Sequence, residues 1–506
     1  MRSVGAMKFP PRARLSGVAL PKAARTISAP TPTNHLSVLP VPPPKELIET
    51  PRVYGGHRLA VLHLHTPNIS SYGDVSLRSK IAYANKWGFS VVAFGDVLDG
   101  GRPPVWSKIR MCQSALENFD WVWWLDADAV ITNFDSDIRS RCLVDSDLLI
   151  ARDQNDINAG SFLLQKGPAT QAFLAAVCDR TDCLRHRWQE QEAMRRLLVS
   201  GYPLRVGYVD KREINSYPSD WCKGDLVIHL PDCSYREERL RGHALCGSLE
   251  FLHFMHAGDL GDIVYSLPTV RALCRAHGKK AVLHLSPKGH TREPMTAERA
   301  EVIAPLLRTL PYVEWAFFDL RPDLPAQAID GNHLDGFRET WRRGGNLSHR
   351  HLSLYNLDWK ECETPWIDVP ARPTSVADVL IARTGRYDTK FPWSEVVARC
   401  GDSVAFLGHR DEHREFCRQF GYVPYYWTAN LAEATKVIAG SSLFVGSATS
   451  LTAIAIGMGQ LTVVGTHGQD VIFNRKGIWN VQQGCGVPWG EIEAEVKNKK
   501  LAGKTK

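Results

Sequence analysis

The chain has 506 residues, 44% apolar and 23% charged, which is ordinary globular composition and long enough for several domains. Its net charge of +7, from 61 Lys and Arg against 54 Asp and Glu, is too mild to indicate a nucleic-acid-binding protein. No stretch approaches the roughly 20 consecutive apolar residues of a membrane-spanning helix. Twelve cysteines without a CxxC pair predict free thiols rather than a disulfide scaffold or a zinc ribbon.

The first 51 residues differ in composition from the rest of the chain. Residues 1–51 hold ten of the 30 prolines and no acidic residue before Glu46, so they cannot bury enough apolar surface to fold alone. We expect a disordered arm. Its basic, acid-poor composition suits an organelle-targeting segment and a flexible extension equally well. For localisation we favour the cytoplasm, with an organelle or the Golgi as the alternative.

Strand and helix patterns alternate from Arg58 onward. The predicted strands cover residues 58–65, 89–94 and 121–125, and the predicted helices cover residues 75–86 and 106–119. Gly88 is expected to end the first helix as a left-handed cap. This alternation predicts α/β units around a mostly parallel sheet.

A second α/β series begins near Leu249, after a charged stretch that ends at Arg241. We therefore predict a domain boundary near residue 245. The predicted divisions are an arm at 1–51, a first domain at 52–245, two Rossmann-like lobes at 246–375 and 376–490, and a basic tail at 491–506.

Two acidic residues, Asp126 and Asp128, directly follow the apolar run 121–125. Carboxylates at i and i+2 on extended backbone point to one side, where they can share a divalent cation with oxygen ligands. The same spacing recurs at Asp135/Asp137 in a predicted loop and at Asp145/Asp147 before a predicted strand, which is the wrong strand end for a ligand crevice. The first pair is therefore the favoured metal site.

Three later segments carry further candidates. His229 closes a short predicted strand and suits a metal, although a single histidine there is more often a hydrogen-bonded core residue. Asn158 to Phe162 is interpreted as a small-residue turn where a sugar could approach the backbone at Gly160, or else as an ordinary turn. Glu190 lies where a helix is expected to begin, as a site residue or as a solvated acid that the helix dipole favours.

Seven sequence blocks occur in an order that resembles glycosyltransferase family 34, which includes yeast galactosyl- and mannosyltransferases and plant xyloglucan xylosyltransferases. They fall within residues 58–240 and are Lys80-Ile-Ala-Tyr-Ala-Asn-Lys-Trp-Gly88, Trp106-Ser-Lys108, Trp121-Val-Trp-Trp-Leu-Asp-Ala-Asp128, Asn158-Ala-Gly-Ser-Phe162, Glu190-Gln191, Ile214-Asn-Ser-Tyr-Pro218 and Gly224-Asp-Leu-Val-Ile-His229. The resemblance implies a GT-A fold with a mixed sheet, a nucleotide-sugar donor, usually a UDP-sugar, and Mn²⁺, with Mg²⁺ as the alternative. It also implies transfer with retention to give an α-linkage.

The resemblance assigns roles to individual residues. Asp126, Asp128 and His229 would bind the metal. Lys108 would lie near the diphosphate. Glu190 and Gln191 would be catalytic residues that face the reacting sugar. Asn158 and Gly160, like Lys108, would contact the donor.

Two departures from the plant members affect the donor site. Pro231-Asp-Cys-Ser234 stands where those members have Gly-Cys-Lys, so their basic donor contact is missing or replaced. Gln189 stands where they carry an acid, so the donor sugar is not inherited from them.

The second half contains two strand–turn–helix units, whose turns offer bare backbone amides to a phosphate or a sugar hydroxyl. Residues 258–268 and 443–450 resemble glycosyltransferase family 9, the heptosyltransferase-type GT-B enzymes, over about residues 249–490. The resemblance implies that Asp262 acts catalytically near the acceptor and that the later turn binds the donor through Gly446, Ser447 and Thr449.

Two departures keep the role of this half open. It is short for two full GT-B lobes, and its later turn lacks the acid and the histidine that the family has there. An active second transferase and a degenerate glycan- or nucleotide-binding module therefore both remain.

We therefore predict an α/β protein with a GT-A domain followed by a compact GT-B-like domain. It would act as a glycosyltransferase on a nucleotide-sugar donor and a glycan or glycoconjugate acceptor. One alternative is a haloacid-dehalogenase-type phosphatase with Asp126 as nucleophile and Asp128 as general acid, which leaves Trp106-Ser-Lys108 and His229 unexplained. The other is a carbohydrate- or nucleotide-binding scaffold, against which the acids of the first half argue.

Overall fold

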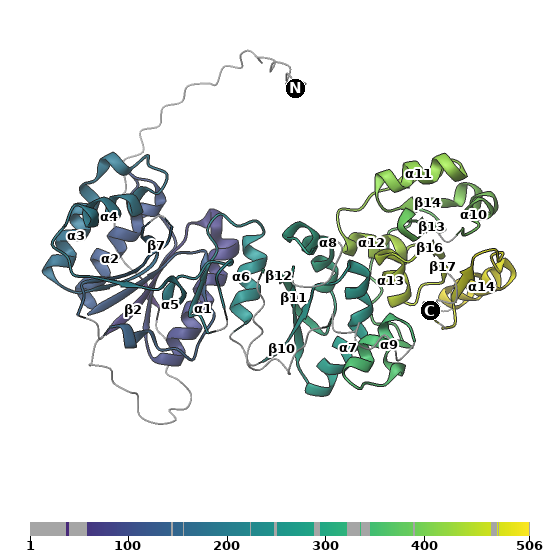
Figure 1. Ribbon diagram of the computed structural model, residues 1–506, viewed down its shortest axis with the longest axis horizontal. Helices are drawn as coiled ribbons and strands as arrows, with labels where there is room; N and C mark the ends of the chain where they lie inside the picture. Colours follow the sequence, from purple (N-terminus) through teal and green to yellow (C-terminus); the bar gives the residue numbers. More distant parts are fainter. Residues whose placement is uncertain are drawn as a thin grey trace, which may run out of the picture. The chain divides into compact units, whose positions relative to one another are not determined.

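The computed structural model describes residues 37–39 and 58–504, with gaps at 143–144, 155, 223, 247–249, 288–293, 321–333, 335–344, 388–389, 467–472 and 474 (Figure 1). The chain from Ser37 onward forms one compact unit. Nearly all of the expected arm, residues 1–51, lies outside the described residues. The α/β class predicted from the alternating patterns is confirmed.

A seven-stranded mixed sheet forms the first half, in the strand order β1-β3-β2-β4-β7-β6-β8. Strand β2 pairs in parallel with β3 and β4, whereas β7 is antiparallel to β4 and β6. The bounds are Ser37–Leu39 for β1, Leu59–Leu64 for β2, Ser90–Phe94 for β3, Trp121–Leu125 for β4, Leu148–Ala151 for β6, Asn158–Gln165 for β7 and Val206–Val209 for β8.

Helices connect these strands and bury their apolar sides against the sheet. Gly88 ends α1 with a positive φ of 73°, as predicted, because a residue without a Cβ adopts the left-handed cap at no steric cost. The helices of this half are α1 at Ser70–Trp87, α2 at Ser107–Asn118, α3 at Pro168–Asp179, α4 at Gln189–Val199, α5 at Lys211–Ile214 and α6 at Arg236–Leu245.

A second, two-stranded sheet brings together residues about 100 positions apart in the sequence. Strand β5, Ala129–Ile131, pairs antiparallel with β9, Val227–His229, so that Ala129 lies opposite His229. Because β5 follows Asp128 directly, this pairing carries His229 to the end of β4. The pairing register is what assembles the predicted site.

Two local expectations are wrong. Asn158 to Phe162 is not a turn but the first part of β7, because β4 and β6 flank it and bond with its backbone on both sides. Asp126 and Asp128 do not lie on extended backbone; they occupy the tight turn between β4 and β5. Their carboxylates still lie close together, because the chain reverses its direction at this turn.

Two parallel sheets make up the second half, as its patterns predict. The smaller sheet has the order β10-β11-β12, and the larger has the order β15-β14-β13-β16-β17-β18. The bounds are Phe251–His256 for β10, Lys280–Leu285 for β11, Val313–Phe318 for β12, Val379–Ala382 for β13, Val404–Leu407 for β14, Tyr425–Tyr426 for β15, Leu443–Gly446 for β16, Thr462–Thr466 for β17 and Ile478–Gln482 for β18.

Eight α-helices accompany the described parts of these sheets. They are α7 at Leu260–His277, α8 at Ala297–Leu307, α9 at Leu347–Leu354, α10 at Trp393–Cys400, α11 at Arg410–Phe420, α12 at Leu431–Ala439, α13 at Ser450–Gly457 and α14 at Trp489–Lys504. One large apolar core joins α7, α8 and α13 to both sheets.

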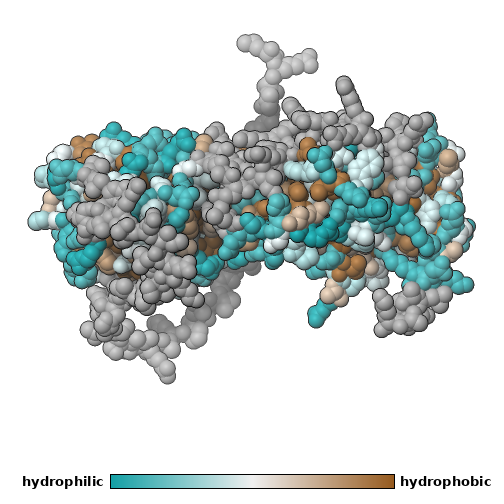
Figure 2. Space-filling model, turned by 90° about the horizontal axis from the view of Figure 1, so that it is seen from below, coloured by the Kyte–Doolittle hydropathy of each residue, from teal (hydrophilic) through white to brown (hydrophobic). Residues whose placement is uncertain are grey.

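The described surface in Figure 2 is largely hydrophilic, with hydrophobic residues scattered between the polar ones. None of the helices that the structure describes combines the length and the apolar character needed to span a bilayer.

Candidate active site of the first half

Asp126, Asp128 and His229 converge at the end of β4. Each offers one ligand atom, and the three atoms lie within 4.8 Å of one another. The His229 Nε2 atom lies 3.1 Å from Asp128 Oδ1 and 4.0 Å from Asp126 Oδ2. Two carboxylates and one imidazole are a suitable donor set for a divalent cation. The three groups that the sequence analysis assigned to a metal are therefore close enough to contact one ion.

Backbone hydrogen bonds hold this cluster in place. The Leu230 amide donates to the Asp128 carbonyl at 2.9 Å, and the Asp126 amide donates to the Gly160 carbonyl at 2.8 Å. Gly160 is needed for close approach, because a Cβ there would overlap the His229 ring. The small residue expected to admit a sugar to a turn thus makes room for a candidate metal ligand.

The acidity of Asp128 reflects its surroundings. Burial would raise the pKa of this carboxyl, but His229 and Arg236 outweigh burial and lower it. Asp128 is therefore held as a carboxylate, which is the form that binds a cation. The side chains of Asp126 and Asp128 remain 28% and 17% exposed, so both can be reached from solvent.

Lys108 lies buried between two of the acidic side chains of the site. Its Nζ atom contacts Asp126 Oδ1 at 3.0 Å and Glu190 Oε1 at 2.9 Å, and donates to the Ala159 carbonyl at 3.0 Å. Burial alone would lower the pKa of Lys108, but the two carboxylates raise it, so the ammonium stays charged. The structure thus places Lys108 and Glu190, predicted from separate motifs, in one ion pair beside Asp126.

Glu190 and Gln191 begin helix α4 and face β7. Glu190 is 6% exposed, and burial raises its pKa against the opposing charge of Lys108. It is therefore a buried ion-pair partner and not a solvated acid. The Gln191 side-chain oxygen accepts a hydrogen bond from the Ala159 amide at 2.9 Å.

Asn158 is held by a polar network next to His229. Its oxygen accepts hydrogen bonds from the Gly160 amide at 2.8 Å and from Asn215 Nδ2 at 2.6 Å, while its amide group donates to Asp153 and to the Tyr217 hydroxyl. Through these bonds the Asn158 side chain fixes the position of β7.

Two basic residues near the acids were not singled out from the sequence. Lys80 is fully buried in α1 and donates to the backbone carbonyls of Leu125 at 2.7 Å and Asp126 at 3.0 Å. Burial lowers its pKa to about 7, against the pull of both aspartates. Arg236 lies 3.7 Å from Asp128 Oδ2 and donates to the Tyr72 hydroxyl at 3.1 Å.

A tryptophan also contacts the acids directly. Trp124, in β4, donates from Nε1 to Asp126 Oδ1 at 2.7 Å, and Lys108 Nζ lies 5.4 Å from the centre of its ring. The family motif contained Lys80 and Trp124, but only the three-dimensional arrangement shows what they touch.

The two other aspartate pairs have ordinary structural partners. Asp135 is exposed and pairs with Lys86 at 2.7 Å, and Asp137 caps the short helix that begins at Ile138. Asp147 accepts two hydrogen bonds from the Arg205 guanidinium, at 3.1 and 2.7 Å. Both pairs thus help to build the fold, in agreement with the preference for Asp126 and Asp128.

The residues predicted for the second half only partly share a cavity. A cavity of about 1240 Å³ is lined by Asp262 in the first turn of α7 and by Thr449 at the start of α13, together with Arg383 and Arg386. Gly446 and Ser447 are not among the residues that line this cavity. Ser447 is 1% exposed and its hydroxyl accepts a hydrogen bond from the Thr384 amide at 3.0 Å.

Comparison with known proteins supports the first-half assignment. The family model of the galactosyl transferase GMA12/MNN10 family matches residues 63–148 and 143–239. A probable alpha-1,2-galactosyltransferase of Schizosaccharomyces pombe, gmh2, is 24% identical over 221 residues, which cover 34% of this chain and 63% of that relative. The chain thus spans slightly less than two thirds of this relative. These matches support the resemblance to family 34 and a glycosyltransferase enzyme.

Solved structures match parts of the chain at low similarity. A glycosyltransferase involved in glycosylation of the major capsid of PBCV-1 is 18% identical with a TM-score of 0.33, covering 36% of this chain and 98% of its own. The E. coli heptosyltransferase WaaC is 15% identical with a TM-score of 0.30, covering 50% of this chain and 99% of its own. The family 9 resemblance of the second half therefore stays an expectation.

Proposed function

We propose that the first half is a metal-dependent retaining glycosyltransferase that moves a sugar from a nucleotide-sugar donor, most simply UDP-galactose, to a glycan or glycoconjugate acceptor. The convergence of Asp126, Asp128 and His229 within 4.8 Å carries this proposal. Galactose is the first donor to test because the matched Schizosaccharomyces pombe relative is named as an α-1,2-galactosyltransferase.

Asp126, Asp128 and His229 would hold Mn²⁺ or Mg²⁺. When bound, such a cation supplies neutralising charge for a departing nucleotide diphosphate. Stabilisation of developing charge by groups already in place is usually the largest contribution to rate enhancement at such sites.

Arg236 is the side chain we propose as the replacement for the missing basic donor contact. It lies 3.7 Å from Asp128 Oδ2, and its side chain is 23% exposed. A guanidinium binds phosphate oxygens through two parallel hydrogen bonds, which suits a diphosphate. Arg236 begins α6 shortly after Pro231-Asp-Cys-Ser234, the segment in which the plant members carry their lysine.

Glu190 would stabilise the sugar as it becomes cationic. Its carboxylate lies beside Lys108 and is shielded from water, so its charge acts in a low-dielectric environment. The acceptor hydroxyl would attack from the face on which the diphosphate departs, which accounts for retention. Gln191 would hold β7 and α4 together through its bond to the Ala159 amide.

The second half would bind a second sugar nucleotide or glycan in the cavity lined by Asp262, Thr449 and Arg386. In the simplest arrangement the two halves add two sugars in succession to one glycan. A degenerate binding module is the alternative for this half, because its later turn has neither acid nor histidine.

The decisive experiment measures sugar transfer and donor hydrolysis by the full-length chain, with a panel of nucleotide sugars and Mn²⁺. We expect Asp128→Asn to reduce the rate by about 100-fold or more, as loss of a group that stabilises developing charge does. Asp135→Asn is the matched control, because it removes the same charge from an exposed aspartate outside the cluster. We expect Glu190→Gln to slow transfer by roughly 10- to 100-fold.

Four outcomes would contradict the proposal or part of it. Equal activity in Asp128→Asn and the wild type removes the metal site from the reaction. Full activity in Glu190→Ala removes the role of Glu190. Binding of UDP with Mn²⁺ but no turnover with any donor favours the scaffold, and release of phosphate from a monoester favours the phosphatase.

A further inference from the structure

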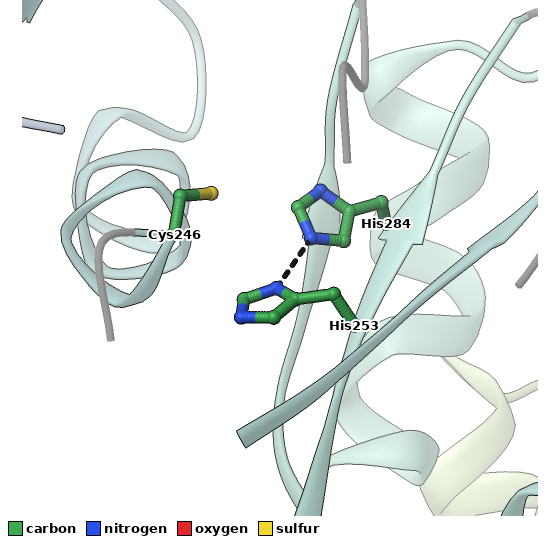
Figure 3. A group of neighbouring side chains, drawn as sticks. All are labelled: Cys246, His253 and His284. Atoms are coloured by element: carbon green, nitrogen blue, oxygen red, sulfur yellow. Dashed lines mark hydrogen bonds between the residues drawn. The ribbon is translucent and has the colours of Figure 1, made fainter. Parts of the chain in front are cut away.

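A thiol and two imidazoles meet between the end of α6 and the three-stranded sheet of the second half (Figure 3). Side chains alternate along β10 and β11, so Leu252 and Leu283 enter the main apolar core while His253 and His284 point to the opposite face. Cys246, directly after α6, covers that face, and in Figure 3 its sulfur points toward the two rings.

All three side chains are removed from solvent. Cys246 is 6% exposed, His253 is 0% exposed and His284 is 1% exposed. Their ligand atoms lie within 4.8 Å of one another, and His253 Nδ1 is 3.1 Å from His284 Nε2. At a tetrahedral zinc ion two imidazole nitrogens would be roughly 3.4 Å apart, and a sulfur and a nitrogen roughly 3.6 Å. The observed spacing needs only small side-chain movements to reach that geometry.

A buried carboxylate fixes the orientation of one imidazole. Asp319 is 2% exposed, and its Oδ2 atom lies 2.8 Å from His284 Nδ1. When His284 Nδ1 donates to this carboxylate, Nε2 keeps its lone pair and faces His253 and Cys246. The same carboxylate–histidine arrangement supports metal ligands in many proteins.

We propose that Cys246, His253 and His284 bind a transition-metal ion of the zinc class, with Asp319 as the carboxylate behind His284. A thiolate and two imidazoles are typical zinc ligands, whereas the hard cations proposed for the first-half site prefer oxygen ligands. The charges also balance, because a divalent cation compensates one thiolate and the Asp319 carboxylate. Binding would release the thiol proton of Cys246 to solvent as the metal–sulfur bond forms.

The ion would act as a structural clip. Cys246 sits at the end of α6, whereas His253 and His284 belong to β10 and β11. Metal binding would therefore tie the helix end to the sheet, and it would stabilise the folded chain because the unfolded chain does not bring these ligands together.

The test is a titration of the full-length, metal-depleted protein with Co²⁺, followed by absorption spectroscopy. We expect a thiolate-to-cobalt charge-transfer band with the intensity of one cobalt–thiolate bond per chain, and we expect zinc to abolish it. The candidate site of the first half contains no cysteine, so a thiolate band does not arise from that site and does not depend on the proposed function.

Variants of the three ligand residues test whether the charge-transfer band comes from the proposed site. Cys246→Ser should abolish it, and His253→Ala or His284→Ala should weaken metal binding at least tenfold. Cys274→Ser is the matched control, because it changes another buried cysteine of the same half that lies outside the cluster.

A second measurement covers the case in which a variant does not fold. The wild-type melting temperature should be higher with one equivalent of zinc than with a chelator. No charge-transfer band in the wild type, a band that persists in Cys246→Ser, or a melting temperature that zinc does not raise would overturn the proposal.

Discussion

Gly160 decides whether His229 can stand next to the aspartates. It lies on extended backbone in β7, so it is not required for an unusual φ; it is required because a side chain would occupy the space of the His229 ring. We therefore expect Gly160→Ala to push His229 away from Asp128 and to lower Mn²⁺-dependent transfer by at least about tenfold, since small displacements of catalytic groups are costly.

Transfer rate and Mn²⁺ affinity measured together check this expectation. Gly490→Ala serves as the control, because a Cβ at Gly490 has no atom within 4 Å and this glycine lies in α14. Undiminished metal affinity in Gly160→Ala would show that the His229 ring can still bind the metal when a Cβ is present at position 160.

Arg236 offers a second residue-scale prediction. If its guanidinium holds the donor diphosphate, Arg236→Ala should raise the donor KM by about tenfold or more and leave acceptor KM unchanged. Arg236→Lys should recover only part of the loss, because an ammonium does not bind two phosphate oxygens in parallel. Steady-state kinetics with donor and acceptor varied separately make the measurement; a rise confined to the acceptor KM would argue against this role.

Sequence motifs identified the acids and His229 but not all of their neighbours. Asp126 and Asp128 could be predicted because a long apolar strand precedes them. Arg236 could not, because its approach to Asp128 depends on the path of the chain through a turn in which Asp232 and Tyr235 both have positive φ. Lys80 stood in a recognised block, but its burial beneath Asp126 is a tertiary contact that no local pattern records.

At the scale of elements, the start of α4 shows how one helix turn holds two site residues. Glu192 lies two positions after Glu190 and accepts hydrogen bonds from Arg195 and Arg196, each at 2.7 Å. The bond from Arg195, with that from Arg196, lowers the pKa of Glu192 to about 2. These bonds stabilise the first turn of α4, which presents Glu190 and Gln191 to β7.

The pH dependence of stability follows from this shift. An unfolded glutamate has a pKa of about 4.3, so between about pH 4.5 and 2 the unfolded chain binds more protons than the folded one. The contribution of Glu192 is present above that range, and the free energy of unfolding falls as the pH falls through it. Glu192→Gln should reduce this acid-induced loss by on the order of 1 kcal/mol, because the arginines are about one-third exposed.

Urea unfolding at pH 6 and pH 3.5, for the wild type and Glu192→Gln, checks the sign. Equal losses in the two proteins would mean that the ion pairs do not hold the helix turn.

Elements were predicted well where the pattern was long and poorly where it was short. Strand β4 and helix α1 follow from apolar periodicity and a terminal glycine. The segment at Asn158 has the small residues that are typical of turns, so its pattern predicts a turn and not a strand. In the structure Gly160 has to be small because a Cβ there would overlap the His229 ring, a cause that becomes visible only when β9 is in place.

For the whole molecule, the question is whether the two halves work independently. Asp262 lies in the first turn of α7 and lines the second-half cavity. We expect Asp262→Asn to leave the Mn²⁺-dependent transfer of the first half unchanged and to abolish any second sugar addition, which mass spectrometry of the glycan products detects. If Asp262→Asn also removes the first transfer, the halves form one active site or depend on each other.

The alternation of elements was enough to predict an α/β protein with two successive series of strands and helices. The convergence of Asp126, Asp128 and His229 was predictable as well, because the motifs of the first half occur in the order of a known family. The second half was not, because the turn after β16 contains no charged residue and its small residues are typical of any parallel sheet.

The hydrogen bond from Trp124 to Asp126 gives the protein an internal optical probe. Indole emission responds to charge and hydrogen bonding nearby, and this indole donates to Asp126 Oδ1, which belongs to the same carboxylate as the Oδ2 atom that faces His229. Subtracting the spectrum of a Trp124→Phe protein from that of the native chain would isolate its signal from the other 14 tryptophans. Cation occupancy could then be followed in real time without a label.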